Sequence, residues 1–225
     1  MIRRTMLFRV KENATPQQVA ELEGLVRETP KKIPCVTSTH LGRNLYDSSM
    51  PDGWGKKWTH VWDFSMDDRK NIPQYRDSEY HMNVLMPVFS PTSPTRLVEK
   101  LTVVYFEPKV FSAKNRDKKP FKQQLIYQIK PDAAKEQIER FDRMMLDMPK
   151  AMPLIRNWCL GTPFGATEQH PWTRVWEWEF LTQKDFQTYL DHKTHMDVVP
   201  FFDPASLVAQ RTNAQYQPEG SVITY

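Results

Sequence analysis

The chain has 225 residues, of which 40% are hydrophobic, and a formal net charge of +4. This length is sufficient for one large or two small hydrophobic cores. The basic residues are dispersed except between residues 109 and 122, where they indicate a solvated linker, so we expect no nucleic-acid partner. No apolar run is long enough to span a membrane, and we expect no membrane partner.

Two cysteines, Cys35 and Cys159, form no disulfide or metal-binding spacing. The first predicted strand follows the N-terminus directly, which leaves no room for a signal peptide. Both features are typical of proteins in a reducing compartment. We therefore expect a cytoplasmic location.

The sequence pattern of the first half predicts four strands and two helical regions. Residues 5–11 alternate between polar and apolar positions and indicate a strand. Thr15 suits a helix N-cap with Pro16 in the first turn, and Pro30 and Pro34 mark the end of that helix. Further strands are predicted at residues 36–44, 57–66 and 97–106, with a loop at 47–55 and a broken helical region at 67–89.

The second half repeats the first. Residues 5–42 align without a gap on residues 124–161 at an offset of 119 positions, so that Phe8 corresponds to Tyr127. A second block aligns at an offset of 114, where Trp-Thr-His-Val-Trp at 58–62 matches Trp-Thr-Arg-Val-Trp at 172–176. The corresponding elements are strands at 122–130, 154–162, 171–180 and 207–217, with helical regions at 132–148 and 182–202. A repeat of this length indicates two copies of one small domain.

Each half therefore has the order β-α-β-β-α-β of a ferredoxin-like domain. A four-stranded sheet with helices on one face leaves its other face uncovered, and two such sheets can cover each other. We predict an α+β fold in which two ferredoxin-like repeats pack their sheets face to face as a pseudo-dimeric barrel. The domains are placed at residues 1–108 and 122–225, with a linker at 109–121. This pseudo-dimer is self-contained, and its further homodimerisation is left open.

The third strand of each half carries aromatic residues at alternate positions, which puts them on one face and the acidic residues on the other. In the first half the aromatic face consists of Trp58, His60, Trp62 and Phe64. Arg174 takes the place of His60 in the second half. The aromatic face is either core beneath the helices or the wall of a pocket, and its central polar residue needs a polar partner.

Tyr75 and His81 form a candidate acid–base pair. Histidine titrates near neutrality, and a tyrosine hydroxyl can hydrogen-bond a developing enolate. Six residues on an ideal helix place two side chains about 120° apart, so the helix must break for them to converge. Asp77 and Ser78 can cause this break by bonding to the backbone. The alternative is that both side chains are buried anchors between helix and sheet.

No metal site is predicted. His192 and His195 have a helical spacing that could hold a metal, but Ser78 stands at the position of His192 in the first half, so the pair is not part of the repeat. Gly42 and Gly161 suit turns after strands, and no phosphate-binding loop is present.

Several segments resemble the stress-responsive A/B barrel family, also called Dabb, for dimeric α+β barrel. They are the helix that Thr15 caps, Leu-Gly-Arg-Asn at 41–44, Trp-Thr-His-Val-Trp-Asp-Phe at 58–64, and the Tyr-x5-His spacing at 75–81. The resemblance covers nearly all of both halves. Family members include plant stress proteins, a polyketide cyclase and a hydroxynitrile lyase, and single-domain members form homodimeric barrels. The chain is similar to one such dimer in a single polypeptide.

The resemblance to the cyclase also implies roles for individual residues. The cyclase's Tyr and His from the last helical region match Tyr75 and His81, and its strand-three His matches His60. A further His near the start of the cyclase is replaced by Arg4 here and by Gln123 in the second half.

The resemblance implies a cofactor-independent lyase, cyclase or isomerase that acts on a small aromatic or polyketide-like substrate. His81 is expected to be the general base, with Tyr75 assisting it and His60 binding a carbonyl or phenol oxygen. The expected substrate-binding residues are Trp58, Trp62, Phe64, Arg174, Tyr189 and His195, of which Arg174 suits an anionic group. Two alternatives remain open: a non-enzymatic stress-responsive binding protein, and a haem- or quinol-type monooxygenase of the wider barrel superfamily.

Overall fold

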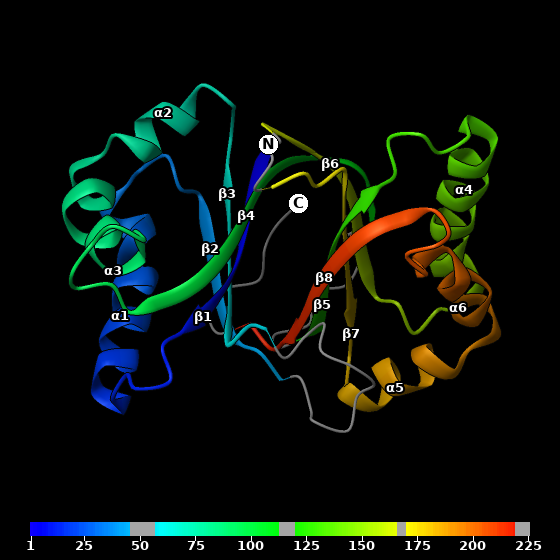
Figure 1. Ribbon diagram of the computed structural model, residues 1–225. Helices are drawn as coiled ribbons and strands as arrows, with labels where there is room; N and C mark the ends of the chain where they lie inside the picture. The colour runs from blue at the N-terminus through cyan, green and yellow to red at the C-terminus, as the bar shows by residue number, and fades with distance from the viewer. Residues whose placement is uncertain (46–56, 113–119, 166–169, 219–225) are drawn as a thin grey trace.

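Figure 1 shows the computed structural model, in which the helices of the two halves lie on opposite outer sides of the strands. The structure describes residues 1–45, 57–112, 120–165 and 170–218. The strands are β1 (Ile2–Val10), β2 (Ser38–Arg43), β3 (His60–Met66), β4 (Val98–Ser112), β5 (Phe121–Ile129), β6 (Asn157–Phe164), β7 (Arg174–Phe180) and β8 (Val208–Tyr216). The helical elements are α1 (Pro16–Lys32), α2 (Asn71–Arg76), η1 (His81–Leu85), α3 (Met86–Phe89), α4 (Lys135–Ala151), α5 (Gln183–Asp191), α6 (Lys193–Val198) and η2 (Val199–Phe202).

The eight strands form one antiparallel sheet in the order β2-β3-β1-β4-β6-β7-β5-β8. The two four-stranded sheets are joined by a ladder between β4 and β6, and a bridge between Asn44 and Tyr216 links the opposite edges. The prediction of two ferredoxin-like repeats in a pseudo-dimeric barrel is confirmed. Because β4 pairs with β6 as far as Ser112, the strand extends into the residues predicted as a linker.

The first helix begins as predicted. The Thr15 side chain accepts a hydrogen bond from the backbone of Gln18, and the Gln18 side chain accepts one from the backbone of Thr15. The helix does not end at Pro30 but continues to Lys32, because the Ile33 N–H closes a final turn on the Thr29 carbonyl. A proline near the C-terminus removes only one hydrogen bond from the helix.

Gly42 and Gly161 lie within β2 and β6, which corrects their assignment to turns. A β-carbon on Gly42 would collide with the side chain of Tyr216, and one on Gly161 would collide with the ring of Phe106. Each glycine therefore permits close approach where the sheet of one half meets the other half.

A cluster of five charged residues connects the two halves inside the barrel. Arg3 pairs with Asp63 of its own half and forms two hydrogen bonds of 2.8 and 3.0 Å with Glu177 of the other half. Lys122 pairs with Glu177 at 2.8 Å and with Glu179 at 3.1 Å. Arg3 and Lys122 occupy equivalent positions of the repeat, as do Asp63 and Glu177, so this buried cluster follows the pseudo-symmetry of the fold.

A reciprocal pair of tryptophans also joins the halves. The indole N–H of Trp58 donates to Thr212 of the second half at 2.6 Å, and that of Trp172 donates to Thr102 of the first half at 2.9 Å. The prediction that Trp58 shares a face with Trp62 is wrong. Because β3 begins only at His60, Trp58 precedes the strand and its side chain packs inside the barrel.

The remaining core lies between each sheet and its helices, in one cluster for each half. Within the described residues, no helix combines the length and apolar composition that a membrane crossing requires.

Candidate functional site

A cavity of about 230 Å³ lies between the sheet of the first half and the segment η1–α3. It is lined by Arg4, Met6, Trp62, Tyr75, His81, Leu85, Met86, Phe89, Ser90, Pro91, Leu101 and Val103. Pro91 is exposed, so the cavity reaches the surface where the chain leaves α3. A dry cavity of about 150 Å³ can hold benzene, so this one has room for a substituted aromatic ring.

Tyr75 and His81 converge on this cavity because the helix between them is broken. The Ser78 hydroxyl donates to the Tyr75 carbonyl at 2.8 Å, the helix resumes after Ser78, and its π-helical turn η1 begins at His81. The predicted break is confirmed with its cause at Ser78, whereas the Asp77 side chain pairs with Arg76 and not with the backbone. The centroids of the Tyr75 and His81 rings are 4.8 Å apart.

The hydrogen bond of His81 fixes which ring nitrogen can act as a base. Nδ1 lies 2.7 Å from the Arg76 carbonyl, which can only accept, so Nδ1 carries the proton and Nε2 has a free lone pair in the neutral ring. Burial and the charge of Arg4 lower the pKa of His81, against the opposing hydrogen bond to Arg76. The neutral, basic form of His81 therefore prevails at pH 7.

The Tyr75 hydroxyl is buried and has no hydrogen-bond partner within the described residues. Burial raises its pKa to about 12, although the charge of Arg4 acts in the opposite direction. Tyr75 is therefore protonated at neutral pH and can donate a hydrogen bond to a ligand oxygen.

Arg4 is a further polar residue of the cavity that sequence reasoning treated only as a missing histidine. Its guanidinium carbon lies between 5.0 and 5.7 Å from the ring centroids of Trp62, Phe64, Tyr75 and Tyr105. Only 7% of the residue is exposed, and Nε and Nη1 lack partners within the described part of the chain. The alternation of side chains along β1 indicates this position of Arg4, because Arg4 lies on the same helix-facing side of the strand as Met6 and Phe8.

His60 does not line the cavity. Its Nε2 lies 3.1 Å from Glu23 of α1, and its ring stacks on Phe8 with a centroid distance of 4.9 Å. Arg174, at the equivalent position, pairs with Asp142 of α4 at 3.1 Å, and Asp142 is the counterpart of Glu23. Both residues thus connect the third strand to the first helix of their own half. The acidic residue of that helix is the polar partner that we expected from the sequence.

Glu23 is the centre of a larger ionic cluster than Asp142. Burial raises its pKa, but hydrogen bonds from Arg43, His60 and Arg27 outweigh that effect and lower the pKa to about 2.

The three predicted aromatic residues have separate positions. Trp62 lines the cavity and donates its indole N–H to Thr39 at 2.9 Å. Phe64 contacts the Tyr75 ring at 4.8 Å between centroids without lining the cavity, and Trp58 lies inside the barrel.

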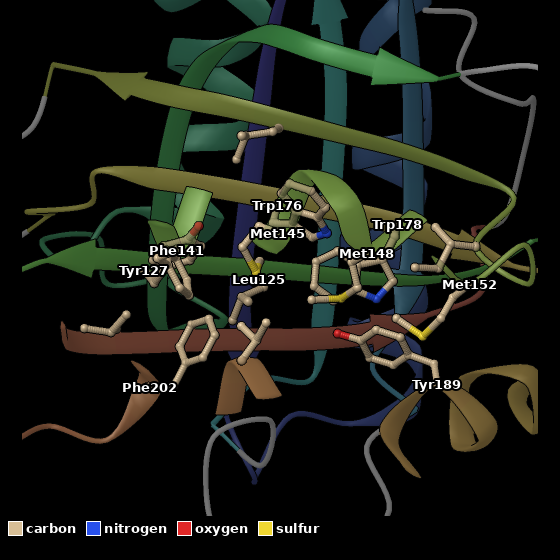
Figure 2. Packing of buried hydrophobic residues seen from close by; sticks show 14 of the residues in the cluster. Leu125, Tyr127, Phe141, Met145, Met148, Met152, Trp176, Trp178, Tyr189 and Phe202 are labelled. Atoms are coloured by element: carbon tan, nitrogen blue, oxygen red, sulfur yellow. The ribbon is translucent and has the colours of Figure 1, made fainter. Parts of the chain in front are cut away.

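The second half keeps the Tyr–His pair. The ring centroids of Tyr189 and His195 are 4.4 Å apart, and His195 Nδ1 donates to the Leu190 carbonyl at 2.9 Å. Around this pair the side chains are bulkier: Trp178 replaces Phe64, and Met148 replaces Thr29. Figure 2 shows Trp176, Trp178, Met148 and Tyr189 gathered in the core between sheet and helices.

Comparison with known proteins identifies the family. The model of the Stress responsive A/B Barrel Domain, Dabb, matches residues 2–103 and 121–215. The chain belongs to the Dabb family. It contains the domain twice, which agrees with the tandem arrangement of the fold.

Solved structures resemble this tandem Dabb protein at low sequence identity. An anthrone oxidase-like protein has a TM-score of 0.69 at 10% identity, covering 98% of this chain and 92% of its own. A protein from Fusobacterium nucleatum, provisionally named a monooxygenase, has a TM-score of 0.63 at 12% identity, covering 98% and 95%. A hydroxynitrile lyase from Passiflora edulis covers 48% of this chain and 100% of its own, with 15% identity and a TM-score of 0.42. The two full-length likenesses establish the fold alone, and no curated protein matches the chain.

The two Dabb repeats also differ by one residue beside the cavity. Val84, Leu85, Met86 and Pro87 in the first repeat correspond to Val198, Val199 and Pro200 in the second. The first repeat accommodates its extra residue in a π-helical turn, η1, whereas the second has the α-helix α6 followed by η2. Such π-bulges occur frequently at functional sites, and two residues of this segment, Leu85 and Met86, line the cavity.

Among the described residues of this Dabb protein, no group of three or more His, Cys, Asp or Glu side chains is placed to hold a metal ion. His192 instead caps α6, where its Nδ1 accepts a hydrogen bond from the Thr194 N–H at 3.2 Å.

Proposed function

We propose that the first-half cavity is the active site of a cofactor-independent acid–base enzyme, a lyase, cyclase or isomerase. Its substrate is a small aromatic or polyketide-like molecule. The observation that carries this proposal is that one largely apolar cavity contains a neutral histidine whose Nε2 has a lone pair, and a protonated tyrosine whose hydroxyl has no partner in the described part of the chain. A convergent polar pair in an apolar pocket is the arrangement from which general acid–base catalysis is built.

In the proposed reaction, His81 Nε2 removes a proton from a phenol or from a carbon next to a carbonyl. The Tyr75 hydroxyl donates to the oxygen on which negative charge develops, and the low dielectric of the cavity strengthens that bond. Trp62 forms an apolar wall for the ring. His60 takes no direct part, because it is engaged by Glu23 away from the cavity.

We place the reaction in the first repeat. The second repeat retains Tyr189 and His195, but larger side chains replace Phe64 and Thr29, and the π-helical turn is lost. There these residues contribute packing between helix and sheet. Arg174, which is paired with Asp142, also has a structural role in this proposal.

A second candidate function is oxygenation of the same kind of substrate with dioxygen as co-substrate. It is supported by the names of the two full-length structural neighbours, an anthrone oxidase-like protein and a provisionally named monooxygenase. The initial step, deprotonation of a phenol by His81, is common to both candidates. A third candidate, a non-enzymatic binding protein, uses the cavity without the proton transfer.

The test begins with thermal shift of the wild type against phenolic acids, aromatic aldehydes and polyketide lactones, because ligands that bind the native state raise its stability. Compounds that bind are then incubated in D₂O, and deuterium incorporation at acidic C–H positions is followed by NMR together with oxygen uptake. We expect incorporation with the wild type and with His195→Ala, and loss of at least about 100-fold in rate with His81→Ala.

Oxygen uptake that depends on His81 would favour the oxygenase. Binding without exchange or oxygen uptake would favour the binding protein. Equal exchange rates for wild type and His81→Ala would contradict the assignment of the base.

A further inference from the structure

Among the residues that the structure describes, no carboxylate or other acceptor accounts for the buried charge of Arg4. Its one hydrogen bond among the described residues is a long contact of 3.7 Å from Nη2 to the sulfur of Met6. The face of the guanidinium is covered by aromatic rings, which offset part of the loss of hydration. The N–H groups at Nε and Nη1 remain unsatisfied, and a buried donor without a partner is destabilising.

Other buried cations of this chain are compensated. Arg3 and Lys122 are paired with carboxylates inside the barrel, and the half-buried Arg174 is also paired, with Asp142. Arg4 differs from them in that it lines a cavity that reaches the surface. A cation in such a place is expected where the missing partner arrives with a ligand.

We propose that the cavity recognises an aromatic substrate that bears a carboxylate, and that Arg4 is the residue that binds this carboxylate. The inference rests on the proposed function, because it names the substrate class of the same site. The apolar lining accommodates the ring, and an arginine can offer two parallel N–H groups to a carboxylate. Tyr75, the other unsatisfied polar group of the cavity, is available as a further donor.

The second repeat provides the matched contrast. It has Gln123 at the position of Arg4. The positive charge that helps to lower the pKa of His195 comes instead from Arg211 of β8, which lies over the Phe202 ring at 5.0 Å, and Asp191 acts in the opposite direction. The arginine at position 4 is therefore specific to the repeat that has the π-helical turn. The chain itself also shows that glutamine is compatible with this strand position.

The test compares ligands that differ only in charge: benzoate with benzamide, and salicylate with salicylamide, each titrated calorimetrically at pH 7.5. The wild type is expected to bind each acid at least about tenfold more tightly than its amide, as a charge-assisted pair predicts. In Arg4→Gln this preference should fall to about twofold or less while amide affinity persists. Arg4→Met, which fills similar space without polar atoms, should behave in the same way if the glutamine variant folds poorly.

Lys135→Gln is the control for net charge, because Lys135 is on the exposed surface of α4 and its side chain is 84% accessible. It should retain the preference of the wild type. Arg4→Lys should retain part of the preference, since lysine keeps the charge but offers no planar pair of donors.

The outcomes separate this inference from the proposed function. Equal binding of acids and amides by the wild type, or a preference that survives in both Arg4→Gln and Arg4→Met, overturns the carboxylate inference and leaves the aromatic site standing. Absence of binding by both ligand classes at millimolar concentration overturns both. An acid preference that depends on Arg4, combined with no deuterium exchange and no oxygen uptake for any of the bound compounds of the thermal-shift panel, supports the inference and contradicts the enzymatic proposal alone.

Discussion

The two repeats are nearly equivalent inside the barrel and differ on their helical sides. Inside, Arg3 and Asp63 of one repeat face Glu177 and Lys122 of the other, and tryptophans exchange hydrogen bonds in both directions. Outside, the first repeat has a cavity with a buried arginine and a π-helical turn, while its partner has larger aromatic and methionine side chains. The difference indicates that the interior is constrained by the pairing of the halves, whereas each helical side can diverge alone.

The largest loss of stability is expected inside the barrel, where the two repeats are most alike. Arg3→Met removes the charge that compensates Asp63 and Glu177, and breaking a buried ion pair in this way costs about 3–5 kcal/mol. Lys122→Met should be similarly destabilising because it leaves Glu177 and Glu179 without this partner. Urea unfolding measures both. A change in the free energy of unfolding below about 1 kcal/mol for only one of the two variants would show that the two positions are not equivalent in energy, despite the symmetry.

A smaller loss of stability, unequal between the two repeats, is expected where the third strand meets the first helix. Glu23→Gln weakens contacts with Arg43, His60 and Arg27 and should cost about 2–3 kcal/mol. Asp142→Asn, in the half-buried pair with Arg174, should cost less than about 1 kcal/mol.

The pH dependence of stability provides a second measurement of the contrast between Glu23 and Asp142. The pKa of Glu23 is lowered from 4.5 to about 2, so its stabilising contribution is complete above pH 4.5 and is lost as the pH falls towards 2. The stability difference between wild type and Glu23→Gln should therefore shrink over that range. A difference that stays constant between pH 5 and pH 2.5 would contradict the ionic origin of the contact.

Deletion of Met86 tests whether the extra residue creates the cavity. The deletion gives the first repeat the length of the second and should convert the π-helical turn into α-helix. We expect the affinity for aromatic ligands to fall about tenfold while unfolding stays cooperative, because Leu85 can keep its buried place. Calorimetric titration and urea unfolding measure the two effects. Unchanged affinity in the deletion variant would separate the cavity from the π-helical turn.

The smallest expected effect concerns the titration of His81. Its pKa is lowered by burial and by Arg4, so Arg4→Gln should raise it towards 6.5, whereas the pKa of His195 should not change. Because the folded-state pKa lies below the ordinary value, the contribution of His81 to stability is present above pH 6.5 and decreases below it. The exchange activity should also decline on the acidic side as Nε2 becomes protonated. NMR titration of the histidine C–H resonances measures the shift, and equal changes at both histidines would argue against a local effect of Arg4.

The repeat was sufficient to predict the barrel, because a duplicated ferredoxin-like domain has an uncovered sheet face that only its copy can cover. The break between Tyr75 and His81 was also predictable, since Ser78 bonds to the backbone locally. The orientation of Trp58 was not, because alternation holds only within a strand and β3 begins two residues later. The partner of His60 lies on another element, and the sequence indicated only that one was needed.

The π-helical turn and the place of Arg4 in the cavity were missed for a related reason. Helical spacing alone does not reveal that one extra residue will be taken up as a π-helical turn, and an arginine in a strand gives no sign of whether a carboxylate will face it. Comparing the repeats position by position also identifies the extra residue, whereas the difference between Arg4 and Gln123 was visible but was interpreted only as the loss of a histidine.

The central claim, that the first repeat alone provides a ligand site, is tested most directly by histidine NMR. The C–H resonances of His81 and His195, assigned with His81→Ala and His195→Ala, are followed while salicylate is added to the wild type. The account predicts a saturable shift of the His81 resonances, with His195 unaffected at the same concentrations. Equal shifts of both histidines, or a saturable shift of His195 alone, would contradict it.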